Sequence, residues 1–131
     1  MNYYHLWFDL RPGVDSRTFP QRVHDYLDYL REQELIAGWK LTRRKFGFGP
    51  AELGEWHAIV EVEDLHQLER AFGQVTRAFN PDHTVTTGSA DPAHPPHDPR
   101  IESLHFPVYS AVQGLKTALY RDYPDVLRGV E

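Results

Sequence analysis

The chain has 131 residues, of which 40% are hydrophobic and 13% aromatic, enough apolar mass for one folded domain spanning residues 1–131. Its formal net charge of −5 would repel a polyanion, so we expect no nucleic-acid partner. Cysteine is absent, which excludes thiolate chemistry and Cys-liganded metals and is compatible with a cytoplasmic location. No apolar run approaches the ~20 residues that span a bilayer, and no signal-peptide pattern is present, so we expect no membrane partner.

Apolar and polar residues alternate in the first half of the chain, which is typical of half-buried strands. This alternation predicts strands at residues 3–10, 39–46 and 55–63. An apolar stripe with helical spacing predicts a helix from Phe19 to Leu30, with Pro20 in its first turn. The glycine-rich segment at residues 47–50 has no following Lys-Ser/Thr and no helix start, so we interpret it as a turn and not as a phosphate loop.

The second half begins with the clearest helix signal. Asp64 and Gln67 form a capping-box pattern, and apolar residues repeat at 3-4-3-4 spacing from Leu65 to Phe79. Residues 80–100 contain five of the ten prolines and three of the eight histidines, which predicts a long loop. Alternation predicts a fourth strand at residues 101–109, whereas the tail after it fits either a helix or a sheet extension.

The order of these elements, βαββαβ, predicts an α+β, ferredoxin-like domain. We expect a four-stranded antiparallel sheet with strand order 4-1-3-2 and two helices on one face. The opposite face would then carry Tyr3, Trp7, Ile59 and Tyr109, which are too apolar to remain in water. Another surface must therefore cover this face of the sheet.

Four sequence segments resemble a family of uncharacterised bacterial proteins in the dimeric α/β-barrel superfamily. These are Tyr4-His5-Leu6-Trp7-Phe8-Asp9-Leu10, Gly38-Trp39-Lys40-Leu41-Thr42-Arg43-Arg44-Lys45, Gly47-Phe48-Gly49-Pro50 and Leu119-Tyr120-Arg121-Asp122-Tyr123-Pro124. The superfamily includes small monooxygenases, lactone isomerases and stress-responsive proteins. The resemblance implies a homodimer whose paired sheets enclose a pocket, but it brings no assigned catalytic residues.

Three histidines, His5, His57 and His105, are predicted to share the face of the sheet that lies away from the helices. Antiparallel register places His57 opposite Trp7 or Asp9, and it places His105 near His5. We therefore expect a His5–His105 neighbourhood and a separate Asp9–His57 neighbourhood. Convergence of all three imidazoles on one metal ion, as in three-histidine zinc sites, is an alternative. Ordinary interface histidines are a further alternative.

These residues suggest a cofactor-independent enzyme that acts on a small apolar organic substrate. His57 would be the general base, Asp9 would orient it, and His5, His105 and Arg44 would stabilise developing negative charge. The residues expected to bind the small organic ligand are Tyr3, Trp7, Arg44, Ile59 and Tyr109. The alternative is a non-catalytic binding or stress-response module that uses the same pocket. We assign no cofactor from the sequence.

Two further hypotheses are weaker. The loop histidines His83, His94 and His97 lie near aspartates, but their spacing matches no closed metal motif. An RNA-binding sheet of the RRM type shares the βαββαβ order. The negative charge and the absence of an RNP1-like pattern argue against that function.

Overall fold

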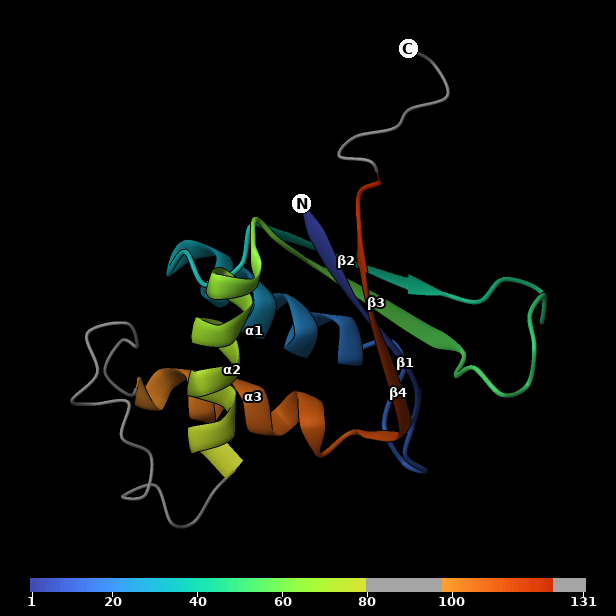
Figure 1. The fold of residues 1–131 in the computed structure, drawn as a ribbon. Coiled ribbons are helices and arrows are strands. Elements are labelled where there is room, and N and C mark those ends of the chain that lie inside the picture. The colour runs from blue at the N-terminus through green and yellow to red at the C-terminus, as the bar shows by residue number, and fades with distance from the viewer. Residues whose placement is uncertain (80–97, 124–131) are drawn as a thin grey trace.

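The computed structural model describes residues 1–79 and 98–123. Its elements are β1 (Asn2–Leu10), α1 (Phe19–Glu32), β2 (Gly38–Arg43), β3 (Trp56–Val62), α2 (Leu65–Phe79), α3 (Pro99–Tyr109) and β4 (Val112–Arg121) (Figure 1). The four strands form one antiparallel sheet in the order β2-β3-β1-β4. This is the ferredoxin-like arrangement, so the predicted fold class and strand order are confirmed.

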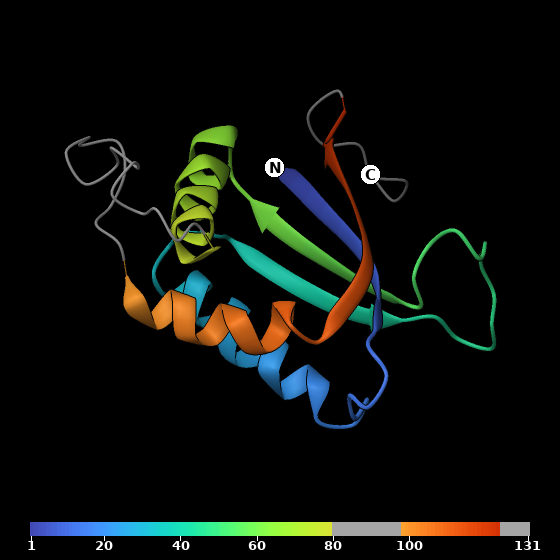
Figure 2. The same ribbon diagram turned by 90° about the horizontal axis from the view of Figure 1, so that it is seen from below.

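All three helices lie on the same face of the sheet (Figure 2). The prediction of two helices was therefore incomplete, because α3 adds a third element to this layer and packs against both α1 and α2. The other face of the sheet has no helix of the described residues over it (Figure 1). No helix in the described ranges is long and apolar enough to cross a membrane.

The segment at residues 101–109 is the main error of the sequence prediction, because it is helix α3 and not the fourth strand. Asp98 caps the helix through a side-chain hydrogen bond from the Arg100 amide, and Pro99 occupies its first turn. Ile101 and His105, four residues apart, are buried, whereas Phe106 is 63% exposed. The buried side therefore follows the helical period and not the strand period.

The fourth strand instead comes from the tail, for which the sequence left helix and strand open. β4 runs beside β1 and forms one edge of the sheet. Most of its residues are exposed, because an edge strand has a neighbour on one side only. Of the predicted loop at residues 80–100, residues 80–97 lie outside the described residues, whereas Pro99 and Arg100 belong to helix α3.

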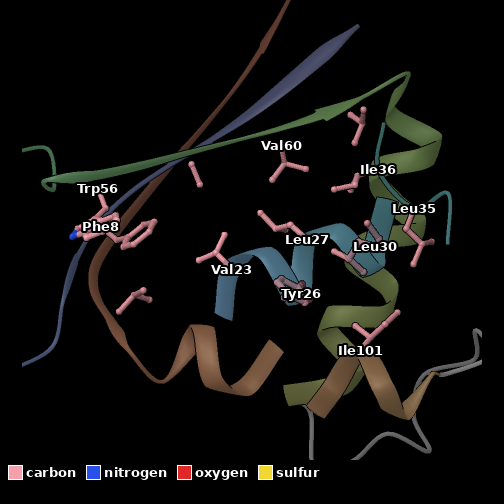
Figure 3. Packing of buried hydrophobic residues seen from close by; sticks show 14 of the residues in the cluster. Phe8, Val23, Tyr26, Leu27, Leu30, Leu35, Ile36, Trp56, Val60 and Ile101 are labelled. Carbon is pink, nitrogen blue, oxygen red and sulfur yellow. The ribbon is translucent and has the colours of Figure 1, made fainter. Parts of the chain in front are cut away.

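The core lies between the sheet and the helices. Phe8, Trp56 and Val60 point from the strands toward Val23 and Leu27 of α1 (Figure 3). The predicted capping box also forms at the start of α2. There the Asp64 carboxylate accepts from the Gln67 amide, and the Gln67 side chain accepts from the Glu63 amide. These local hydrogen bonds fix the start of α2, and residues of α2 form one wall of the site described next.

Candidate ligand-binding site

A cavity of about 260 Å³ lies within the chain, between the sheet and the three helices. It is on the opposite side of the sheet from the pocket that the sequence suggested. Strand residues such as Leu6 and Val60 form its roof, and α1, α2 and α3 form its walls. The described lining residues are Tyr4, Leu6, Phe8, Val23, Tyr26, Leu27, Leu30, Ile36, Ala58, Val60, Leu68, Ala71, Phe72, Val75, His105, Val108, Tyr109, Val112 and Leu115.

The cavity has an apolar mouth. Three of its lining residues, Phe72 of α2, Tyr109 of α3 and Leu115 of β4, are 41%, 49% and 42% exposed. Residues that both line a cavity and contact solvent mark the place where it opens. Leu119 of β4 is also exposed and lies opposite Tyr4, another lining residue. A small molecule would therefore enter over apolar side chains between α2, α3 and β4.

His105 is the imidazole in the cavity wall, and it is only 8% exposed. The Tyr26 ring meets it edge-on at 5.0 Å between centroids, and the Tyr109 ring stacks on it at 5.7 Å. Burial lowers the pKa of His105 from its ordinary 6.5 to about 4, because the charged form would lose its hydration. Burial raises the pKa of Tyr26 for the same reason. Both groups are therefore neutral at pH 7.

The open face of the sheet carries a different cluster. His5 and His57 form a hydrogen bond at 2.9 Å between Nδ1 and Nε2. Trp7 stacks on His57 at 4.8 Å between centroids, with nearly parallel rings, and Tyr120 of β4 meets His5 edge-on at 4.7 Å. Burial and, second, the neighbouring His5 lower the pKa of His57. In the single chain His5, Trp7 and His57 are half-buried, whereas Tyr120 is exposed.

The register prediction for His57 is confirmed, because His57 lies directly opposite Trp7. The predicted Asp9–His57 pair was wrong. The Asp9 carboxylate accepts from the Glu55 amide at 2.9 Å, whereas His57 bonds the diagonal neighbour His5. A bulge in the β1–β4 pairing between Trp7 and Asp9 also changes the local geometry.

The predicted His5–His105 neighbourhood was also wrong, because α3 places His105 on the helix side of the sheet. This separation removes the three-histidine metal site that the sequence left as an alternative. Among the described residues, no group of three His, Asp or Glu side chains lies close enough to hold a metal ion. The loop histidines His83, His94 and His97 lie outside those residues.

The remaining predicted site residues lie in several different parts of the structure. Ile59 and Tyr3 lie on the open face, where the Tyr3 hydroxyl donates to Asp122 at 2.9 Å. Tyr109, predicted for the same face, is at the cavity mouth on α3. The Arg44 guanidinium donates to the carbonyl groups of Pro50, Leu53 and Gly54, so it braces the β2–β3 loop and does not face the cavity.

Most cavity residues were missed as site residues because the sequence marks them only as core. Leu27 and Val60, for example, follow the same apolar periodicity whether the space beside them is filled or empty. His105 was found, but on a strand. Its helical spacing from Ile101 and Val108, together with the Asp98-Pro99 start signal, would have placed it on the core side.

The described geometry defines a ferredoxin-like α+β domain with an apolar internal cavity. Within this class, the chain belongs to DUF6614, a family of unknown function, which it matches over residues 1–91. The protein At3g17210 from Arabidopsis thaliana has a similar crystal structure, with a TM-score of 0.62 and 10% sequence identity. The match covers 97% of this chain and 100% of that one, and at this identity it shows the shared fold alone.

A second solved structure is a dimeric protein of unknown function with a ferredoxin-like fold from Bacteroides fragilis NCTC 9343. Its TM-score is 0.49 at 11% identity, over 91% of this chain and 93% of that one. No curated protein is significantly similar to the chain. The site must therefore be interpreted from its own chemistry.

Proposed function

We propose that this protein is a homodimer that binds a small, mainly apolar organic molecule in the cavity between its sheet and its helices. The observation that carries the proposal is the cavity itself. It occupies about 260 Å³ where protein interiors are normally close-packed. An apolar cavity with a mouth and few polar groups is typical of a small-molecule site.

The volume sets the size of the ligand. An apolar cavity of ~150 Å³ in another protein holds benzene, which has six non-hydrogen atoms. Scaling by volume, 260 Å³ accommodates a molecule of about ten non-hydrogen atoms. Naphthalene has this size and is a suitable probe.

We favour binding over catalysis. Of the predicted catalytic residues, His105 lines the cavity, whereas His5, His57 and Asp9 are elsewhere. A neutral imidazole with a pKa near 4 is a weak general base at pH 7. The enzymatic alternative therefore depends on His105 acting as a hydrogen-bonding group and not as a proton acceptor.

The homodimer is proposed from the open face. Antiparallel sheets that face water usually carry polar residues there, but this face carries Trp7, Ile59 and Tyr120 around the histidine pair. A second copy of the same face would cover these side chains, as an isologous interface requires. A cytoplasmic location remains a prediction from the absence of cysteine.

The experiment that tests the cavity as the ligand site fills it with a larger side chain. Ala71 of α2 is buried and lines the cavity, so Ala71→Leu should remove space for the ligand without removing any contact. We expect naphthalene, followed by its fluorescence, to bind the wild type and to bind this variant at least ~30-fold more weakly, as a loss of ~2 kcal/mol of contacts implies. The matched control is Ala51→Leu in the exposed β2–β3 loop.

The Ala71→Leu variant should also unfold at a temperature equal to or above that of the wild type, because filling a cavity adds contacts. Unchanged naphthalene affinity in this variant, or no binding to the wild type, would remove the cavity as the ligand site.

A further inference from the structure

The polar side chains of the cavity wall are few and are unevenly distributed. Apart from the hydroxyl groups of Tyr4, Tyr26 and Tyr109, the polar side chain among the described lining residues is His105, on α3. No Asp, Glu, Lys or Arg is among those lining residues. Tyr109 is half exposed at the mouth, whereas His105 and Tyr26 are both buried and their rings touch. The buried polar groups are thus gathered at one place in an apolar space.

This arrangement discriminates between kinds of ligand. An ionised carboxylate moved into the cavity would lose its hydration without gaining a positive partner among the described lining residues, which include no Lys or Arg. The imidazole of His105 is neutral at pH 7 and has one N–H donor and one nitrogen acceptor. A hydroxyl group can bond one of these nitrogens, because it can donate to an acceptor or accept from an N–H.

We propose that the ligand is an uncharged hydroxy compound of about ten non-hydrogen atoms, such as a phenol, whose hydroxyl group binds the His105 imidazole while its apolar body fills the cavity. The proposal rests on the proposed function and adds the chemical class of the ligand to it. His105 acts here as a binding residue that selects for a hydroxyl group and against an anion.

The test compares three ligands that share the naphthalene ring at pH 7: naphthalene, 1-naphthol and 1-naphthoate. The measured quantity is the ratio of 1-naphthol to naphthalene affinity in the wild type and in His105→Leu. We expect this ratio to fall about tenfold in the variant, because the buried hydroxyl group loses its partner. Naphthalene affinity should change less than about twofold, since Leu preserves the apolar surface. The control is His24→Leu on the exposed side of α1.

1-Naphthoate should bind the wild type at least ~100-fold more weakly than 1-naphthol, because its charge would be desolvated. A naphthol-to-naphthalene ratio that is the same in His105→Leu and wild type would overturn the role of His105. Naphthoate binding equal to that of naphthol would overturn the selection for an uncharged ligand. In both cases naphthalene binding, and with it the proposed function, would stand; absence of naphthalene binding would instead refute the proposed function.

A second measurement keeps the proposal testable if His105→Leu does not fold. In wild-type protein with ¹⁵N-labelled histidine, saturation with 1-naphthol should shift the two imidazole nitrogen resonances of His105 more than saturation with naphthalene does. Equal shifts for the two ligands would contradict a hydrogen bond to His105. His105→Gln, which retains a donor and an acceptor, should recover part of the lost naphthol preference.

Discussion

The two faces of the sheet are built from alternating residues of the same strands, yet their chemistry differs. On the helix side, Phe8 of β1 lies opposite Trp56 of β3, and both rings contact Phe19 of α1 edge-on. One residue away on the open face, Trp7 lies opposite His57 and stacks on it. The helix face encloses an apolar cavity, whereas the open face exposes an aromatic and imidazole cluster. The difference suggests two tasks, ligand binding on one side and self-association on the other.

The largest expected effect comes from substituting two neighbouring residues of β1, one on each face of the sheet. Phe8→Ala should lower the free energy of unfolding by about 3–5 kcal/mol, because it removes a buried aromatic ring from the core. Trp7→Ala should affect folding less and self-association more, because Trp7 is half-buried on the open face. Urea unfolding and sedimentation at several protein concentrations measure the two effects.

In that comparison, the wild type should sediment as a dimer and the Trp7→Ala protein as a monomer at low micromolar concentration. A Trp7→Ala protein that is as dimeric as the wild type, or a wild type that is monomeric throughout, would show that the open face is not the interface.

A smaller expected effect is the dependence of the free energy of unfolding on pH, which differs between the two faces. The pKa of His105 is about 4 in the folded chain and ordinarily 6.5, so the unfolded chain takes up a proton first as the pH falls. The contribution of His105 to the free energy of unfolding is therefore fully present above pH 6.5. It falls by about 3 kcal/mol as the pH is lowered from 6.5 to 4. His105→Leu should reduce this acid destabilisation, whereas the exposed His24→Leu should not, as measured by urea unfolding at pH 7, 5.5 and 4.5.

If both variants lose stability with acid as steeply as the wild type, His105 is not held neutral by burial. Ligand should oppose the loss, because a molecule that binds only the folded state stabilises it. Saturating 1-naphthol should therefore raise the unfolding temperature of the wild type more than that of His105→Leu.

The smallest expected effect is on the open face. Burial and the adjacent His5 lower the pKa of His57, so its folded form resists protonation and a small part of the stability is lost as the pH falls below 6.5. In an NMR titration, His57 should titrate below 6.5, and His5→Phe should move its midpoint upward by removing the neighbouring imidazole. A midpoint that does not move would show that burial alone causes the shift.

Local sequence signals predicted much of this fold. The alternation in β1 and β3, the apolar stripe of α1 and the capping box of α2 each depend on residues close together in the chain. The antiparallel register followed from the order of these elements, and it placed His57 opposite Trp7. These features were predictable because each residue's environment repeats with the period of its own element.

The C-terminal third was not predictable in the same way. Leu104, Phe106 and Val108 alternate as in a strand, but Ile101, His105 and Val108 also share a helical face. A short apolar segment with both periods is ambiguous. Contact with α1 and α2 stabilises the helix in this segment, and β4 then completes the sheet from the tail.

The sequence by itself determined the order and kind of the first five elements, the chemistry of the two faces of β1 and β3, and the absence of thiol chemistry. Only the tertiary structure decided which face of the sheet holds the cavity. It also decided that His105 lines this cavity, whereas His5 and His57 lie on the other face. The physical reason is that periodicity tells which side chains avoid water, whereas a cavity depends on how closely three helices and a sheet approach one another, and that distance is a property of their packing.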